Sequence, residues 1–233
     1  MKHFALALLL SIVTASAPAW AEAEFDVTYW DTDEGRALQS RIPEKADYWQ
    51  LIPTFAVQIT QSYCSVASAI TVLNAMPIQK PVDPTYAPYA FFTQTNFFTP
   101  EVTEIISAET VLKMGMTREE MTATLNAQGV SARSVAGDTF NDGDLRTLLQ
   151  YTLGDDGQFV LANYYRASLG QVGGGHWSAL AAYDVETDSV LILDVAKYKY
   201  PPVWVGTSTL RTAIATLDTT SNKSRGLVIV SKD

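Results

Sequence analysis

Cysteine and histidine are scarce in this 233-residue chain, which has one cysteine, Cys64, and two histidines, His3 and His176. A single cysteine excludes a disulfide within the chain. With one histidine outside the N-terminal segment, it also excludes the usual four-ligand zinc site of cysteine and histidine. A thiol and an imidazole can form a nucleophile and its base. The sequence therefore predicts that, if either residue acts chemically, Cys64 and His176 act on each other. A buried structural thiol is the alternative.

Apolar runs long enough to cross a membrane, which takes about 20 residues, are also lacking. The N-terminal run from Phe4 to Val13 follows a short basic start and precedes Ala19-Trp20-Ala21. This pattern indicates a secretory signal peptide over residues 1–21, cut before Glu22, with an uncleaved anchor as the alternative. We therefore expect an exported, periplasmic bacterial protein without membrane association after cleavage.

Positive charge is in deficit, with 16 Lys and Arg against 25 Asp and Glu and a formal net charge of −9. Nucleic-acid binding needs a basic surface that faces the phosphates, so nucleic acid is not expected as a partner. The hydrophobic fraction of 47% and the aromatic fraction of 11% indicate a globular chain. We expect residues 22–233 to form one domain. The oligomeric state is left open, with a homodimer as one arrangement.

Hydrophobic patterning predicts helices in the N-terminal half and strands after Gly157, and thus an α+β fold. The helical half is expected to pack on an antiparallel sheet, with an active-site cleft between them. Residues 22–50 are read as a surface arm and 81–100 as an aromatic loop. The expected helices are 64–76, 117–129, 141–153 and 207–217, and the expected strands are 158–164, 176–183, 190–195 and 225–231.

Cys64 is expected at the first turn of its helix, which Pro77 ends. The unpaired N–H groups and the dipole at a helix N-terminus favour a thiolate. Gln58, six residues upstream, offers a side-chain amide that can join the Cys64 N–H as an oxyanion hole. A plain surface glutamine is the alternative.

His176 follows three glycines, of which Gly175 is adjacent, and glycines permit close approach of a substrate backbone. A flexible loop before a strand is the alternative. Asp194 ends an apolar run and is costly to bury without a partner. Contact with Asp194 would fix the tautomer of His176. A symmetric hairpin turn places His176 opposite Lys197, so contact requires a shifted register or a bulge.

The order of Cys64, His176 and Asp194 along the chain resembles that of papain-like cysteine peptidases, and the surrounding stretches resemble phytochelatin synthases. The matching stretches are residues 61–68, 72–75, 174–178 and 191–205. The last stretch includes the long and unusual run Asp194-Val195-Ala196-Lys197-Tyr198-Lys199-Tyr200-Pro201-Pro202. The resemblance extends from about Gln50 to Lys232.

This resemblance implies a papain-like fold and thiol-dependent attack on glutathione, with loss of glycine and a γ-glutamylcysteinyl thioester on Cys64. By the family pattern, His176 is the base, Asp194 orients it and Gln58 supplies the oxyanion amide. Arg225 matches an arginine suited to the substrate carboxylate, although an ordinary strand-end arginine is the alternative. No bound cofactor or metal site is implied. Soft metal ions (Cd, Zn, Cu) are expected to enhance activity as metal–glutathione thiolates.

Two neighbours depart from the family pattern, since Ser65 replaces a glycine and Ala179 a proline. The cysteine-rich C-terminal half of the eukaryotic enzymes is missing, so the chain is expected to resemble the short bacterial form. That form implies mainly glutathione hydrolysis to γ-Glu-Cys, with phytochelatin synthesis second. The alternatives are a papain-like peptidase on another peptide, and a non-catalytic exported protein that binds glutathione or metal through its thiol.

Overall fold

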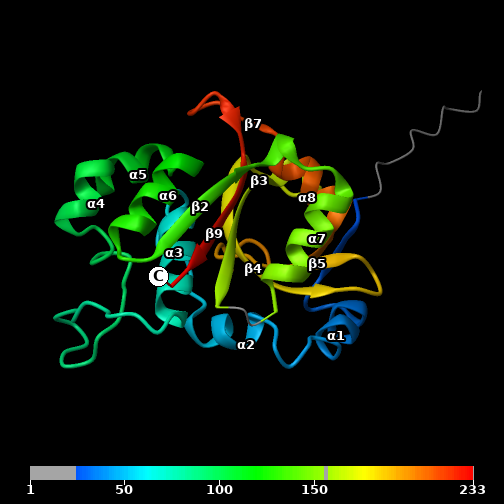
Figure 1. The fold of residues 1–233 in the computed structure, drawn as a ribbon, viewed down its shortest axis with the longest axis horizontal. Helices are drawn as coiled ribbons and strands as arrows, with labels where there is room; N and C mark the ends of the chain where they lie inside the picture. Colours follow the sequence, from blue (N-terminus) through cyan, green and yellow to red (C-terminus); the bar gives the residue numbers. More distant parts are fainter. Residues whose placement is uncertain (1–24, 155–156, 233) are drawn as a thin grey trace, which may run out of the picture.

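The computed structural model describes residues 25–154 and 157–232, so the expected signal peptide, 1–21, lies outside the described residues. Within the described part, seven strands form one antiparallel sheet in the order β1-β6-β5-β4-β3-β9-β2 (Figure 1). A separate hairpin, β7–β8, projects from one end of the molecule. The strands are β1 (Val27–Tyr29), β2 (Ser131–Ala136), β3 (Gln158–Tyr165), β4 (Gly175–Asp184), β5 (Ser189–Leu193), β6 (Val203–Gly206), β7 (Leu217–Asp218), β8 (Lys223–Ser224) and β9 (Gly226–Ser231).

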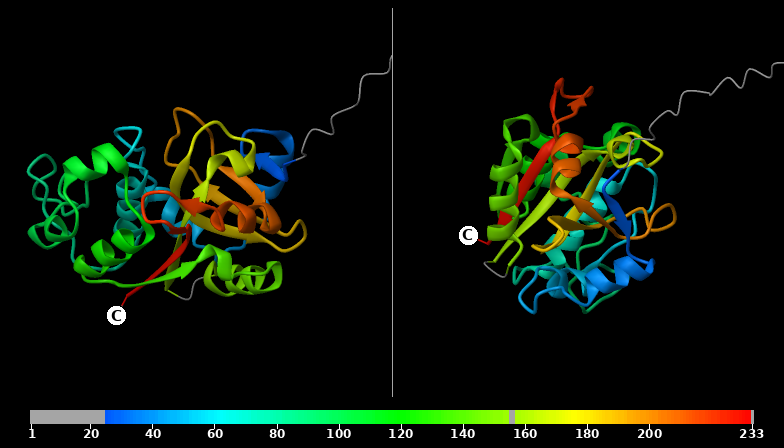
Figure 2. Two further views of the ribbon diagram at one scale, coloured as in Figure 1. Left: turned by 90° about the horizontal axis from the view of Figure 1, so that it is seen from above. Right: turned by 90° about the vertical axis from the view of Figure 1, so that its right-hand side faces the viewer.

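Helices cover both faces of this sheet, as the two views of Figure 2 show. None of the helices described is long and apolar enough to span a bilayer. The α-helices are α1 (Asp33–Gln39), α2 (Tyr48–Leu51), α3 (Cys64–Ala75), α4 (Pro100–Ile105), α5 (Ala108–Met114), α6 (Arg118–Ala127), α7 (Asp142–Thr152) and α8 (Thr207–Ile214). The short 3-10 helices are η1 (Ile52–Thr54), η2 (Gly137–Thr139) and η3 (Arg166–Leu169).

Two hydrophobic cores lie on opposite faces of the sheet. The first packs helices from the N-terminal half, α3 and α6 among them, against side chains such as Trp177 and Leu193. The second packs α7 and α8 against the alternate side chains, such as Leu180 and Ile192. Because successive residues of a strand point to opposite faces, a sheet covered on both sides has nearly continuous apolar strands. β5 meets this condition, since all five of its residues are buried.

The α+β class and the antiparallel sheet agree with the sequence prediction, whereas a helical half packed on a strand half is too simple a description. Strands β1 and β2 precede Gly157, and helix α8, which the sequence predicted at 207–217, follows it. The predicted surface arm, 22–50, is also wrong in its described part, since it forms β1, α1 and the start of α2 and buries Leu38. Short elements carry too few residues to show a period, which explains these misses.

Helix α3 is buried along nearly its whole length, from Cys64 to Asn74. A helix enclosed on all sides needs small and apolar residues around its whole circumference, and this segment supplies alanine, serine and valine. Met76 is already extended, as expected for a residue before Pro77. The helix packs across β4, which brings its N-terminus to the end of the sheet where β4 begins.

The β4–β5 hairpin contains a bulge that settles the register question. Near the turn, Tyr183 pairs with Val190, whereas beyond the bulge Ala179 pairs with Leu193. The register therefore shifts by one residue between the turn and the far end of the hairpin. If the pairing is continued beyond Ala179 and Leu193, Asp194 lies opposite Ser178. His176 is two residues from Ser178 on the same strand, so it points to the same face of the sheet.

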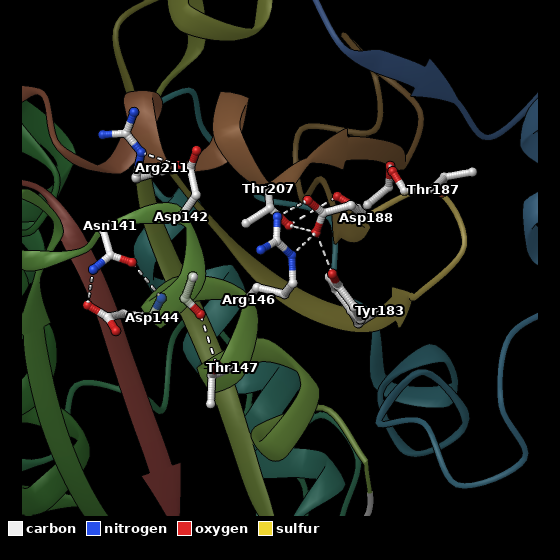
Figure 3. Close-up of polar contacts among 12 residues, drawn as sticks. Asn141, Asp142, Asp144, Arg146, Thr147, Tyr183, Thr187, Asp188, Thr207 and Arg211 are labelled. Carbon is white, nitrogen blue, oxygen red and sulfur yellow. Dashed lines mark hydrogen bonds and ion pairs between the residues drawn. The ribbon is translucent and has the colours of Figure 1, made fainter.

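The hairpin turn is tied to the second helical layer through Asp188, which has a positive φ of 51°. Its carboxylate accepts hydrogen bonds from Tyr183, from Thr207 at 2.7 Å and from Nε of Arg146 at 3.0 Å (Figure 3). The Arg146 guanidinium is the main group that lowers the pKa of Asp188, to about 2. One turn residue thus joins α7, α8 and the hairpin.

Replacement of Asp188 by asparagine should lower the free energy of unfolding by about 1 kcal/mol at neutral pH, because it removes the charged acceptor of three donors. Asparagine tolerates the positive φ, so the backbone is kept. The lowered pKa means that the carboxylate stabilises the fold fully above its usual value of 3.8 and loses this effect as the pH falls toward about 2.

Urea unfolding at pH 7, 4 and 2 tests this, and the difference between wild type and Asp188→Asn should shrink over the last interval. Asp144→Asn is the matched control on α7, the helix that carries Arg146, because the Asp144 side chain accepts from Asn141 alone among the residues of Figure 3. A difference that is constant with pH would contradict the assignment.

Candidate active site

Cys64 is the first residue of α3, as predicted, and the residue is 7% exposed. The preceding residue, Tyr63, makes no side-chain cap of this helix. Helix N-termini leave their first N–H groups without partners inside the helix. Cys64 is therefore held where unpaired donors and the helix dipole favour a negative sulfur.

His176 and Asp194 meet at the same end of the sheet. His176 is the second residue of β4, and Asp194 follows the last residue of β5, so antiparallel pairing brings them together. The His176 Nε2 atom is 2.9 Å from Asp194 Oδ1, and both side chains are almost fully buried. The contact that the symmetric hairpin did not predict thus occurs, with the bulge supplying the register shift.

The thiol and the imidazole shift each other's pKa. Burial by itself would raise the pKa of Cys64, but the charge of His176, a hydrogen bond with its ring and backbone hydrogen bonds outweigh burial and lower that pKa. Burial would lower the pKa of His176, but the charge of Cys64 and the hydrogen bond to Asp194 raise it instead. Both shifts favour a thiolate beside an imidazolium. Such a pair is the state in which a cysteine attacks a carbonyl carbon.

Asp194 stays ionised although it is buried, because it has partners on both oxygens. Burial would raise its pKa, but His176 and Arg166 lower it to about 2. The Arg166 guanidinium donates to both carboxylate oxygens, at 2.8 and 2.9 Å, and the Ala196 N–H donates to Oδ1 at 2.9 Å. Asp194 can therefore orient His176 at any pH near neutrality.

Two polar cavities flank His176 and Gly175, which line both. The first has a volume of about 220 Å³ and is lined by Cys64, and we call it the Cys64 cavity. The other, of about 260 Å³, is lined by Gln58 and we call it the Gln58 cavity. His176 and Gly175 therefore border both the space lined by Cys64 and the space lined by Gln58.

Gln58 is buried but lies in a different cavity from the sulfur. Its side-chain nitrogen donates to the Thr60 carbonyl and to the Tyr198 hydroxyl, both at 2.8 Å. Its side-chain oxygen is buried and makes no hydrogen bond to the described residues. In this arrangement both amide hydrogens are engaged, so stabilising an oxyanion requires the bond to Tyr198 or Thr60 to be exchanged.

Arg225 and Gly175 lie together in the Cys64 cavity. The Arg225 Nη1 atom donates to the Asn163 side chain at 2.8 Å, whereas its Nε is buried and unpaired among the described residues. Asp218 is its nearest carboxylate, at 4.0 Å. Burial lowers the pKa of Arg225, which marks a guanidinium short of anionic partners. A β-carbon on Gly175 would overlap this guanidinium, so glycine leaves the room that Arg225 occupies.

Sequence reasoning missed three residues that contact this site. Arg166 pairs with Asp194, Asn163 binds Arg225, and the Tyr164 ring lies edge-on to His176 with centroids 5.5 Å apart. All three follow one another on β3 or just after it. The polar Asn163 inside an apolar strand was the available signal, since a buried amide needs partners. Arg166 resembled an ordinary strand-end arginine.

No cluster of three or more histidine, cysteine or acidic side chains suited to a metal ion occurs among the residues placed in the structure. Metal binding therefore has no candidate ligand set within that part of the chain.

Comparison with known proteins gives one family. A family model described as phytochelatin synthase matches residues 24–227. The chain is 29% identical over 229 residues to glutathione gamma-glutamylcysteinyltransferase 1 of Triticum aestivum, which covers 97% of this chain and 43% of that protein. It is 26% identical to the Arabidopsis thaliana protein of the same name, over 96% of this chain and 44% of that one. The chain thus spans less than half of the length of these curated relatives.

Among solved structures, the peptidase domain of Streptococcus ComA, described as a bi-functional ABC transporter involved in a quorum sensing pathway, is similar with a TM-score of 0.45. It shares 14% sequence identity and covers 76% of this chain and 97% of that chain.

Replacing His176 by glutamine should slow alkylation of Cys64 by iodoacetamide at pH 6.5 by at least about tenfold. The variant loses the imidazole that lowers the thiol pKa, while burial, which raises it, remains. Because Cys64 is the single cysteine of the chain, mass spectrometry of the intact protein reports its alkylation directly. Thr220→Ala is the control, since Thr220 lines the same cavity without charge. Equal rates for wild type and His176→Gln would contradict a His176-activated thiolate.

Proposed function

The chain belongs to the phytochelatin synthase family, and we propose that it transfers γ-glutamylcysteine from glutathione through a thioester on Cys64, with release of glycine. The observation that carries the proposal is the buried contact between His176 and Asp194 beside a Cys64 thiol of lowered pKa. The relatives from Triticum aestivum and Arabidopsis thaliana support the same reaction, since both are named glutathione gamma-glutamylcysteinyltransferase 1. A cysteine at a helix start facing a histidine on a sheet also supports the papain-like arrangement.

In the first step, the Cys64 thiolate attacks the carbonyl carbon between cysteine and glycine of glutathione. The imidazolium of His176 gives its proton to the glycine nitrogen, so the C–N bond breaks and glycine leaves as a neutral amine. The products are a thioester on Cys64 and a neutral His176. Asp194 holds the imidazole so that one nitrogen faces it and the other faces the sulfur.

In the second step, the neutral His176 takes a proton from the acceptor as the acceptor attacks the thioester carbonyl. Water as acceptor gives γ-Glu-Cys, and the α-amino group of a second glutathione gives a phytochelatin. Either attack breaks the C–S bond and restores the thiolate beside the imidazolium. The same groups therefore serve both outcomes, and the acceptor decides the product.

Recognition of the donor is assigned to the Cys64 cavity. Arg225 is the cationic group there, and its unpaired Nε and lowered pKa favour binding of a substrate carboxylate. Gly175 keeps the space that the guanidinium fills. Gln58, which lines the neighbouring cavity together with His176, can supply an oxyanion donor once substrate replaces its bond to Tyr198.

Hydrolysis is proposed as the main outcome, with phytochelatin synthesis second. The Cys64 cavity, in which the thioester forms, is lined by the polar side chains of Asn163, Thr219 and Thr220, so it is a polar space in which water can reach the thioester. Soft metal ions enter this scheme as thiolate complexes of glutathione, that is, as a form of the substrate. The site of action is proposed to be the periplasm, after removal of residues 1–21.

Exposure of the protein to millimolar glutathione should yield a γ-glutamylcysteinyl adduct on Cys64 in intact-protein mass spectra. Cys64→Ala should show neither the adduct nor glycine release, since it lacks the acyl carrier. Free γ-Glu-Cys should exceed (γ-Glu-Cys)2-Gly among the products. Dominance of the longer product would contradict the hydrolytic preference, and turnover without an adduct after rapid quenching would contradict the covalent route. Cleavage of α-linked peptides at equal rates would favour a peptidase instead.

Gly175→Ala should raise the KM for glutathione by about tenfold with a smaller change in kcat, because its β-carbon displaces the guanidinium of Arg225. Gly174→Ala is the matched control, since a β-carbon there meets nothing within 4 Å. Steady-state kinetics of glycine release measure both variants. Equal KM values for the two variants would contradict a role of Arg225 in binding the substrate.

A further inference from the structure

We propose that Arg166 is a positioning residue, which acts on the reaction through Asp194 by fixing the carboxylate and offsetting its charge on His176. Its effect on turnover rests on the proposed function, whereas its effect on Cys64 reactivity does not.

Arg166 and Asp194 form a two-pronged ion pair that is buried from solvent. Nη1 donates to Oδ2 at 2.8 Å and Nη2 donates to Oδ1 at 2.9 Å. Arg166 is 3% exposed and Asp194 is 0% exposed. A planar guanidinium that meets a carboxylate with two parallel bonds leaves it one orientation. Arg166 therefore selects the rotamer in which Oδ1 faces His176.

Arg166 is itself held by its surroundings. Its backbone N–H donates to the Gly174 carbonyl at 3.0 Å, and its guanidinium donates to the Gln171 side chain at 2.5 Å. The guanidinium carbon lies 5.1 Å from the centroid of the Tyr200 ring. These contacts link it to the glycine segment before His176 and to the segment after β5. The Arg166 side chain is thus preorganised before substrate binds.

Pairing with Arg166 also changes the electrostatic effect of Asp194 on the His176 imidazolium. An unpaired buried carboxylate would hold the proton of His176 strongly through its charge. With Arg166 in place, the arginine and the aspartate together are neutral, and the charge that faces the imidazolium most directly is the Cys64 thiolate. Asp194 then contributes orientation more than charge, which leaves His176 able to release its proton to the leaving group.

Other charged and titratable groups face the same region from several elements. They are Cys64 on α3, Tyr164 on β3, Tyr198, Lys199 and Tyr200 in the segment after β5, Asp218 on β7 and Arg225 before β9. None of them is substituted in the Arg166 variants, so these groups are common to the variants and the wild type.

Arg166 also lines the Gln58 cavity, so direct binding of a substrate carboxylate is the competing role. The two roles separate in the absence of substrate. An arginine that only binds substrate alters KM, and any effect of its charge on Cys64 persists when Asp194 is replaced, whereas an arginine that acts through Asp194 loses its effect on Cys64 when Asp194 is replaced.

The experiment measures iodoacetamide alkylation of Cys64 between pH 4 and 9, with no glutathione present. Removal of a positive charge disfavours deprotonation throughout the pair, so Arg166→Gln should move the midpoint to higher pH by about one unit. Arg166→Lys keeps the charge and loses the two-pronged geometry, so its midpoint should stay near that of wild type while glutathione turnover falls. Arg41→Gln is the matched control, because Arg41 forms a two-pronged pair with Asp184 at the other end of β4.

Asp194→Asn provides the reciprocal test, and it also serves if Arg166→Gln does not fold in thermal melts. It leaves the Arg166 charge without its counterpart, so the midpoint should move to lower pH. Since Arg166 acts through Asp194, Arg166→Gln should then shift the midpoint much less in the Asp194→Asn background than in the wild-type background. The proposal is overturned if folded Arg166→Gln keeps the wild-type midpoint, if Arg166→Lys shifts as far as Arg166→Gln, or if Asp194→Asn leaves the midpoint unchanged. If the wild-type protein released no glycine from glutathione, the proposed function would be rejected. The pH midpoints of Cys64 alkylation would still test the role of Arg166, because they are measured without glutathione.

Discussion

The antiparallel pairing of β4 with β5 is the constraint on which the rest of this site depends. It brings the first residues of β4 to the same end of the sheet as the residue that follows β5, and its bulge moves the register by one. Without that shift, His176 would face Lys197, a cation, and the pair would repel when the imidazole is charged. With it, Nε2 of His176 lies 2.9 Å from Asp194. Helix α3, packed across β4, then needs only to place its N-terminus at the same end.

The site concentrates charge where the fold excludes water, which is costly unless every charge has a partner. Four groups share that cost: Cys64, His176, Asp194 and Arg166. The thiolate balances the imidazolium and the carboxylate balances the guanidinium, so the buried cluster is neutral in total. Arg225 stands outside this balance, since its nearest carboxylate is 4.0 Å away and its Nε is unpaired among the described residues. A partly buried cation without a full partner beside a nucleophile is suited to an anionic substrate.

Much of the fold could be predicted from the sequence, and the misses have physical causes. The helix at 64–76 and the strands at 158–164 and 176–183 match α3, β3 and β4 within two residues at each end. Those segments are long enough to show a period or an apolar run. Strand β1 has three residues and β6 has four, so neither shows a pattern by itself. Strand β2 is largely exposed and makes a sheet strand only because β9 pairs with it.

The sequence by itself determined the chemical inventory: one thiol, one histidine beyond the N-terminal segment, an aspartate too costly to bury alone, and a helix that begins at Cys64. These follow from residue type and local order, which do not depend on distant contacts. Only the tertiary structure decided that Asp194 reaches His176, that Arg166 neutralises Asp194, and that Gln58 and Cys64 line different cavities beside His176. Those relations depend on register and on the packing of segments far apart in the chain. A one-residue slip of a strand costs little in local propensity, yet it would exchange every partner in the site.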